Sequence, residues 1–175
     1  MSKEQRDKVL SIASAEIGIE ESPAGSNKVK YNTWIYGKEV QDGYNLKGEK
    51  DPKAKYPWCG AFDSWCFDKA GLTIKKAGLL KGFIGCQYAV AHVLDWGVIT
   101  STPEPGDIVF FDWNKDGKYD HTGIFEKDNS DGGKTFTAIE GNTAKGNDSN
   151  GGKVMRRDDR KYSQAIFVTP NVYTK

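Results

Sequence analysis

The sequence is poor in cysteine and histidine. Its 175 residues include only 3 cysteines (Cys59, Cys66, Cys86) and 2 histidines (His92, His121). No two cysteines form a CxxC pair, so neither a disulfide framework nor a structural zinc site is expected. With only two histidines, few positions can supply an imidazole base.

Long apolar runs and an excess of one charge are also missing. No segment approaches the roughly 20 apolar residues of a membrane helix, and a net charge of +1 does not favour nucleic acid or an anionic membrane as partner. Residues 2–8 are charged and lack the continuous apolar core of a signal peptide. We therefore expect one domain over residues 1–175, made in a cytoplasm without a signal peptide.

The pattern of apolar residues changes from helical to strand-like along the chain. Helical spacing predicts helices at 2–17, 26–36, 59–70 and 86–96. Short apolar or alternating runs predict strands at 107–111, 121–126, 135–140, 153–157 and 165–168. The polar stretch 41–55 has no period and is expected to be a long surface loop. Helices followed by consecutive strands predict an α+β fold with an antiparallel sheet.

Cys59 opens one of the predicted helices. Pro57 disfavours helix at the residue before it, so the helix should begin near Cys59. A thiol at a helix N-terminus meets free N–H groups and the positive end of the helix dipole, which both favour the reactive thiolate. The alternative is a small buried core residue, and this is the expectation for Cys66 and Cys86.

The two histidines differ in their surroundings. His92 lies within a helical pattern and is expected to be structural or exposed, whereas His121 opens a strand directly after a loop. Glu140 and Asn142 lie at the end of the next strand. Because the start of one strand lies beside the end of the next in an antiparallel hairpin, His121 and Glu140 should be neighbours. A cysteine nucleophile needs such a base, and the base needs a third group to orient it.

Four motifs in this order resemble the cysteine, histidine-dependent amidohydrolase/peptidase (CHAP) family. They are PWCGAF at 57–62, PGDIVFF at 105–111, DHTGI at 120–124 and EGN at 140–142. The resemblance implies a papain-like α+β fold, with N-terminal helices packed on an antiparallel sheet of five to six strands. It also implies hydrolysis of bacterial peptidoglycan, as in phage endolysins.

The same resemblance assigns roles to particular residues. It implies that Cys59 is the nucleophile, His121 the general base, Glu140 the group that orients His121, and Asn142 a fourth polar helper. It implies no organic cofactor. Backbone N–H groups at the helix start, Cys59 among them, would hold the oxyanion, and Tyr56 or the 41–55 loop could add a donor. Gly60 and Asp63 differ from the bulkier or apolar residues that family helices often carry there.

The expected partner is peptidoglycan, without nucleic acid or membrane, and a separate wall-binding domain or chain is possible. The resemblance implies that the protein is made in a host bacterial cytoplasm and acts on the cell wall after its release. The bond cut is either that of an N-acetylmuramoyl-L-alanine amidase or that of a stem-peptide or cross-bridge endopeptidase. Two alternatives remain open: a non-catalytic wall-binding module, and a cysteine amidohydrolase that acts on a substrate outside the wall.

The segment before His121 has the start of a calcium-binding loop. Oxygen-bearing residues alternate and a glycine stands sixth, so Ca²⁺ ligands are predicted at Asp112, Asn114, Asp116, the Lys118 carbonyl and Asp120. The glutamate expected at the twelfth position is replaced by Gly123. The alternative is a solvated hairpin turn without an ion, which Asp, Asn and Gly also form well.

Overall fold

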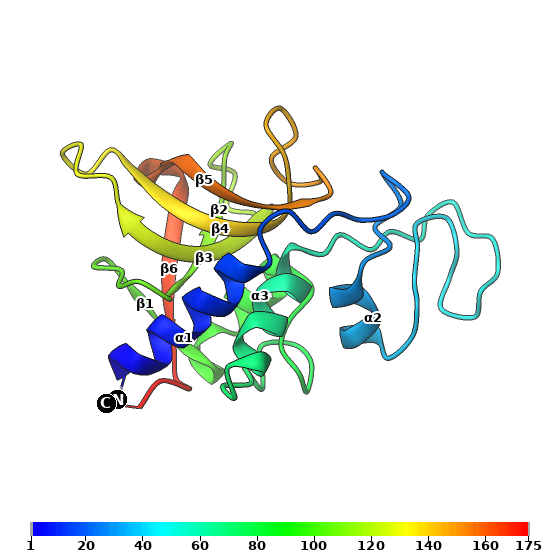
Figure 1. Cartoon of the computed structure of the whole chain (residues 1–175), viewed down its shortest axis with the longest axis horizontal. Coiled ribbons are helices and arrows are strands. Elements are labelled where there is room, and N and C mark those ends of the chain that lie inside the picture. Colours follow the sequence, from blue (N-terminus) through cyan, green and yellow to red (C-terminus); the bar gives the residue numbers. More distant parts are fainter. Residues whose placement is uncertain (1, 175) are drawn as a thin grey trace.

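The computed structural model describes residues 2–174, which form four α-helices and one six-stranded sheet (Figure 1). The helices are α1 (Ser2–Ala15), α2 (Lys30–Tyr36), α3 (Cys59–Lys69) and α4 (Cys86–Ala91), with 3-10 turns η1 (Val93–Asp95) and η2 (Tyr162–Gln164). The strands are β1 (Gly97–Thr100), β2 (Ile108–Phe111), β3 (His121–Asp128), β4 (Thr135–Thr143), β5 (Lys153–Lys161) and β6 (Ala165–Pro170). The predicted α+β class is confirmed.

The sheet has the order β1-β6-β2-β3-β4-β5, and neighbouring strands are antiparallel. Strands β2 to β5 follow one another, and β6 returns to lie between β1 and β2. The sequence pattern did not predict β1. This strand is four residues long, and Val98 and Ile99 are both exposed, so it lacks the inward–outward alternation that marks a strand. Pairing with β6 gives it its conformation.

Two predicted helices are shorter than expected. The helix predicted at 26–36 begins only at Lys30, because Asn27 has a left-handed φ of 56° and Val29 is extended. The single helix predicted at 86–96 is wrong: α4 ends at Ala91, and His92 leaves helical geometry before the tight turn η1. The His92 side chain is about half exposed, in agreement with the expectation of a structural or surface histidine.

The sheet has an apolar cluster on each face. Side chains alternate along a strand, so Ile108 and Phe110 of β2 join the core shared with α1 and α3, whereas Val109 and Phe111 join a second cluster with Phe136. Helix α3 packs against β3 and β4, and both α1 and α2 pack on α3. The first residue of α3 is thereby brought to the start of β3.

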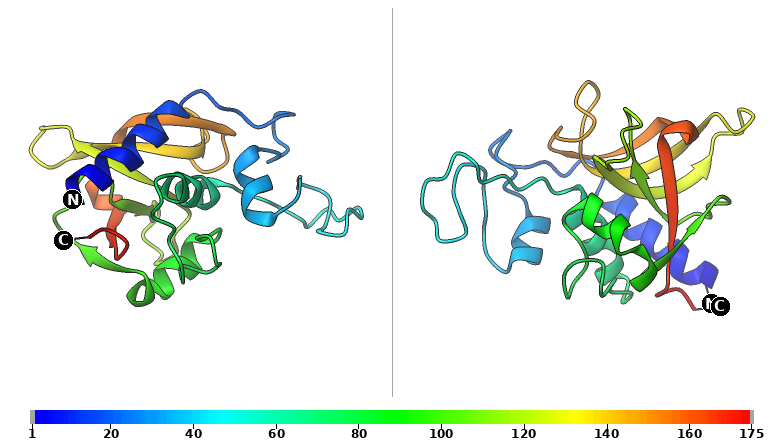
Figure 2. Two further views of the ribbon diagram at one scale, coloured as in Figure 1. Left: turned by 60° about the horizontal axis from the view of Figure 1, so that its bottom comes forward. Right: turned by 180° about the vertical axis from the view of Figure 1, so that it is seen from behind.

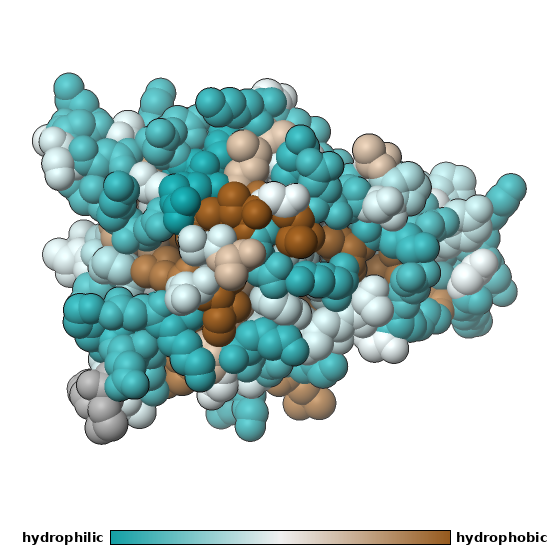
Figure 3. Space-filling view, viewed as in Figure 1, coloured by the Kyte–Doolittle hydropathy of each residue, from teal (hydrophilic) through white to brown (hydrophobic). Residues whose placement is uncertain are grey.

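The first helix and the last described residues lie close together (Figure 2), where the Thr174 N–H donates to the Gln5 side chain at 2.9 Å. The loop predicted at 41–55 is confirmed as part of the connection between α2 and α3, and it extends away from the sheet (Figure 1). The face seen in Figure 1 is mostly hydrophilic, with apolar atoms gathered near its centre (Figure 3). Within residues 2–174, no helix has both the length and the apolar content of a membrane span.

Candidate active site

Cys59 is the first residue of α3 and only 5% of its surface is exposed. The residue before it, Trp58, is the N-cap, and in the part of the chain that the structure describes its side chain makes no capping hydrogen bond. The first N–H groups of a helix have no partner inside the helix. They therefore leave a positive helix end beside the sulfur, which stabilises a thiolate.

His121 is the first residue of β3, opposite Phe111 of β2. Its ring is fully buried and stacks on two aromatic rings, with centroids 5.8 Å from Phe111 and 5.6 Å from Trp113. These contacts restrict the imidazole to one orientation. Trp113 therefore packs beside the proposed base, and Trp58 is buried in the core against Tyr31.

Glu140 lies in β4, and its carboxylate is hydrogen-bonded to the imidazole of His121. The distance from His121 Nε2 to Glu140 Oε1 is 2.7 Å, and both side chains are fully buried. The expected proximity of these two residues is therefore confirmed. The Glu140 side chain passes over Gly123 of β3, where an added Cβ would lie only 2.6 Å from Glu140 Cγ. Gly123 thus leaves the space that Glu140 needs to reach the ring.

The sequence reasoning missed Arg160 of β5, which holds Glu140 from the other side. Its Nε and Nη2 lie 2.7 Å and 2.6 Å from the two carboxylate oxygens, a paired geometry that favours the charged carboxylate. Burial raises the pKa of Glu140, but the hydrogen bonds from Arg160 and His121 outweigh it and hold that pKa below its usual value. Glu140 is therefore ionised.

Cys59 and His121 are close enough for each to change the pKa of the other. Nδ1 of His121 has no hydrogen-bond partner within residues 2–174, so it is the nitrogen free to exchange a proton with Cys59. Burial lowers the pKa of His121, but Cys59 and Glu140 outweigh it and raise the pKa to about 9. Both shifts favour a thiolate beside an imidazolium over a neutral thiol beside a neutral imidazole.

Cys86, expected to be a core residue, is buried but also contacts Cys59. The two sulfur atoms lie 3.9 Å apart, since α3 and α4 both begin with a cysteine at this point. Hydrogen bonding from the Cys86 thiol is the largest effect that lowers the pKa of Cys59, burial opposes it, and His121 adds to the lowering. The result is a pKa well below that of an ordinary thiol.

Asn142 lies on β4 near Glu140, but its hydrogen bonds go to the loop that follows. Its amide donates to Asn150 Oδ1 at 3.2 Å, and its Oδ1 accepts the Gly152 N–H at 3.1 Å. The backbone there is left-handed, with φ of 57°. In this structure Asn142 therefore secures the 144–152 loop rather than bonding to His121.

Two further expectations concern the residues around α3. The Tyr56 hydroxyl donates to the Tyr44 carbonyl at 2.8 Å and so fixes the long loop. Gly60 allows residues 83–84 to approach α3, because an added Cβ would lie 2.7 Å from the Ile84 carbonyl oxygen. The departure from bulkier residues at this position thus has a packing reason.

The predicted calcium loop is folded around its own carboxylates. Asp112 accepts N–H groups of Asp116 and Gly117 at 3.1 Å and 2.9 Å, and Asn114 donates to Asp116 at 3.1 Å. These bonds are typical of Asx turns. Burial and then the charges of Asp116 and Asp112 raise the pKa of Asp120, so the three carboxylates lie near one another.

Carboxylate and carbonyl oxygens suit a hard cation such as Ca²⁺. Even so, among residues 2–174 no group of three or more acidic, cysteine or histidine side chains is placed to hold an ion. The carbonyl of Lys118 was the predicted ligand. In the structure the backbone N–H of this residue donates to Asp116 Oδ1 at 2.9 Å. Calcium binding stays a prediction, and we derive no chemical step through an ion.

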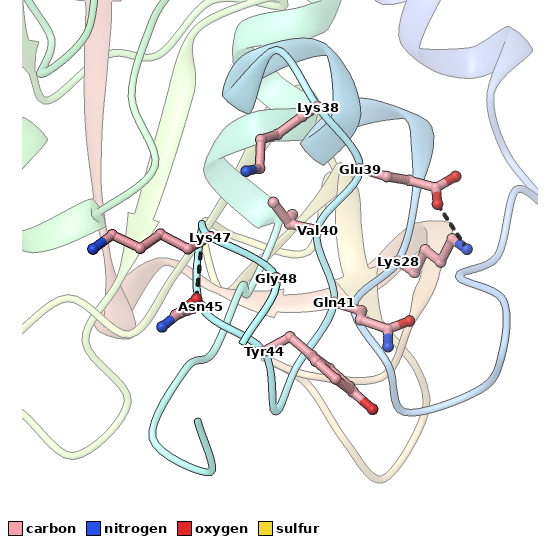
Figure 4. Close-up of a pocket in the computed structure, with 9 residues that line it drawn as sticks. All are labelled: Lys28, Lys38, Glu39, Val40, Gln41, Tyr44, Asn45, Lys47 and Gly48. Carbon is pink, nitrogen blue, oxygen red and sulfur yellow. Dashed lines mark hydrogen bonds and ion pairs between the residues drawn. The ribbon is translucent and has the colours of Figure 1, made fainter. Parts of the chain in front are cut away.

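A separate pocket of about 330 Å³ lies in the long loop (Figure 4). An ion pair between Lys28 and Glu39, 2.9 Å apart, crosses one side of it. Its lining residues are Lys28, Lys38, Glu39, Val40, Gln41, Tyr44, Asn45, Lys47 and Gly48. The lining does not include Cys59, His121, Glu140 or Asn142, so this pocket is distinct from the site around Cys59.

Comparison with known proteins gave one match. The family model described as "CHAP domain" matches residues 51–142, just over half of the chain. The matched region begins before α3 and ends at Asn142, so it includes Cys59, His121 and Glu140. No curated protein and no solved structure matched the chain.

Proposed function

Because the chain belongs to the CHAP domain family, whose members are generally cysteine- and histidine-dependent amidohydrolases or peptidases, we propose that it hydrolyses an amide bond of peptidoglycan with Cys59 as nucleophile. The bond is that of an N-acetylmuramoyl-L-alanine amidase or of a stem-peptide or cross-bridge endopeptidase. One observation carries the proposal: Glu140 lies 2.7 Å from Nε2 of His121, whose Nδ1 is left free beside Cys59.

The reaction begins with the Cys59 thiolate. The sulfur attacks the amide carbonyl carbon, a C–S bond forms, and the carbonyl π electrons move onto oxygen. Free N–H groups in the first turn of α3 stabilise that oxyanion. His121 then gives its Nδ1 proton to the leaving amine, and the C–N bond breaks to leave a thioester.

Hydrolysis of the thioester completes the cycle. His121, now neutral, takes a proton from water as the water oxygen attacks the thioester carbonyl. The C–S bond breaks, the acid product leaves, and the thiolate–imidazolium pair is restored. Glu140 keeps the ring oriented through both steps and stabilises its charged form, as its 2.7 Å contact allows.

The test is digestion of purified peptidoglycan by the native protein and by the Cys59→Ala variant, followed by mass spectrometry of the products. New peptide amino termini would identify an endopeptidase, and peptides freed from the sugar would identify an amidase. We expect one of these with the native protein and neither with the variant. Equal digestion by the variant would refute cysteine catalysis, and no digestion by either would refute peptidoglycan as the substrate.

A further inference from the structure

Asp63 is a buried acidic residue one helical turn after Cys59. Its side chain is fully buried, in a stretch of α3 where its neighbours Phe62 and Ala61 belong to the apolar core. Within residues 2–174 no lysine, arginine or histidine forms an ion pair with it, and its Oδ1 has no hydrogen-bond partner. A carboxylate in such a place is expected to be neutral or paired.

The hydroxyl of Thr122 indicates whether Asp63 is neutral or ionised. Thr122 Oγ1 lies 2.8 Å from Asp63 Oδ2 and also 2.8 Å from the Val109 carbonyl oxygen. A hydroxyl has a single proton to donate, whereas an ionised carboxylate and a carbonyl both only accept. If Asp63 were ionised, one of these two short contacts would lack a proton. If Asp63 is protonated, its O–H donates to Thr122 Oγ1, which in turn donates to Val109, and both contacts are satisfied.

The charges around Asp63 agree with this proton count. The titratable groups that face it are Cys59 and Cys66 of α3, Cys86 of α4, His121 of β3 and Glu140 of β4. Burial is the largest effect and raises the pKa of Asp63, and the charges of Cys59 and Glu140 raise it further. The Thr122 hydrogen bond and the His121 charge oppose them, and the pKa remains well above its usual value.

Thr122 also connects Asp63 to the candidate site. It follows His121 directly in β3, and its backbone N–H acts on the Cys59 sulfur and lowers the pKa of that thiol. The contact between Asp63 and Thr122 therefore joins α3 to β3 at the level where Cys59 meets His121. Asp63 makes this contact through its side chain, with Oδ2 at 2.8 Å from Thr122 Oγ1.

We propose that Asp63 is a neutral carboxylic acid at neutral pH and a positioning residue, which joins α3 to β3 through Thr122 and so holds Cys59 beside His121. Its protonation does not depend on what the enzyme cleaves, and only its value to catalysis rests on the proposed function. Being neutral, it adds no negative charge beside the Cys59 thiolate. Asparagine has the same shape and can also donate to Thr122, so it is the matched replacement.

The experiment measures the rate of Cys59 alkylation by iodoacetamide against pH, with peptide mapping to separate the cysteines. In Asp63→Asn we expect the same Cys59 pKa as in the native protein. In Asp63→Leu, which cannot donate to Thr122, we expect the pH profile of alkylation to show a roughly fivefold smaller acid ionisation constant for Cys59, the equivalent of one net hydrogen bond. Asp68→Asn serves as the control. Asp68 lies on the same helix as Asp63, and its carboxylate accepts a hydrogen bond from Thr73, which follows the helix.

Two outcomes would overturn the proposal. A lower Cys59 pKa in Asp63→Asn would mean that a negative charge had been removed, so that Asp63 was ionised. Unchanged alkylation in Asp63→Leu would refute the positioning role. Neither result depends on peptidoglycan hydrolysis, so a failure of the proposed function would be recognised separately.

Infrared spectroscopy of the folded native protein tests protonation if Asp63 variants do not fold. We expect a carboxylic-acid carbonyl band at neutral pH that moves in Thr122→Val, because the hydrogen bond to the acid changes while Asp63 stays in place. Asp107 also has a raised pKa, and its band would not respond to Thr122→Val. The proposal would be contradicted if the native spectrum had no carboxylic-acid band, or if Thr122→Val left every such band in place.

Discussion

His121 Nε2 lies 2.7 Å from Glu140 Oε1, and neither side chain has any exposed surface. A buried carboxylate is stable as an ion only with good partners, and Arg160 supplies the second one through two short hydrogen bonds. The His121 imidazolium depends on Glu140, and Glu140 depends on Arg160. The candidate site therefore includes a residue of β5 that acts on His121 through Glu140.

Gly123→Ala tests the space that Glu140 needs. The added methyl group would lie 2.6 Å from Glu140 Cγ, so the carboxylate must move away from His121. Misplacing a catalytic group by about 1 Å can cost on the order of 100-fold in rate, and we expect a loss of that size in peptidoglycan hydrolysis. Gly85→Ala is the control, because its Cβ would meet no atom closer than 3.9 Å. Full activity in Gly123→Ala would contradict this role.

Arg160→Met tests the buried ion pair. Removing one partner of such a pair leaves an uncompensated charge and typically costs about 3–5 kcal/mol, which urea denaturation would measure. Arg156 on the same strand also contacts a glutamate twice, at 2.7 Å and 3.0 Å from Glu126, but this pair is partly exposed. Arg156→Met should cost only about 0–1 kcal/mol. Equal losses of unfolding free energy in the two variants would show that burial of the Arg160–Glu140 pair does not increase its contribution to stability.

Cys86→Ala tests the contact between sulfur atoms. The Cys86 thiol is the largest effect that lowers the pKa of Cys59, so its removal should raise that pKa and slow alkylation of Cys59 at pH 6. Cys66→Ala deletes another buried thiol, from α3, and provides the control for lost packing. If Cys59 is alkylated at the same rate in the two variants, hydrogen bonding from Cys86 does not stabilise the Cys59 thiolate.

The calcium prediction is tested by thermal unfolding with and without the ion. If the 112–120 loop binds Ca²⁺, millimolar calcium should raise the melting temperature of the native protein, since a ligand that binds only the folded state stabilises it. A variant with both Asp112→Asn and Asp116→Asn should not respond. Identical melting of the native protein in EDTA and in calcium would refute binding.

Local chemistry explains which parts of the site could be predicted from the sequence. Cys59 and His121 begin elements with clear apolar periods and Glu140 lies near the end of another, so their order along the chain was enough to bring His121 and Glu140 together. Arg160 could not be found in this way. In β5 the buried positions Val154, Arg157 and Arg160 recur every three residues because the pairing with β4 shifts register, so the run resembles a solvated charged strand.

Residues that act through close approach were also missed. Cys86 looks like an ordinary core cysteine until α4 is placed against α3, and the space above Gly123 matters only because a side chain from the next strand occupies it. Asp63 stood out in the sequence only as an unusual polar residue. Its meaning came from Thr122, 59 positions later in the chain. Such contacts depend on tertiary geometry, which periodicity does not encode.

The central claim is that Cys59 is a thiolate paired with the imidazolium of His121, which adds to the effect of the Cys86 thiol. Its most direct test is the pH dependence of Cys59 alkylation in the native protein and in His121→Ala, resolved by peptide mapping. The native thiol should react well below the usual cysteine pKa of about 8.5, with a change near pH 9 as His121 loses its proton. In His121→Ala the Cys59 pKa should rise, and the rate at pH 6 should fall on the order of tenfold for each unit by which that pKa exceeds 6. Identical profiles in the two proteins would contradict the account.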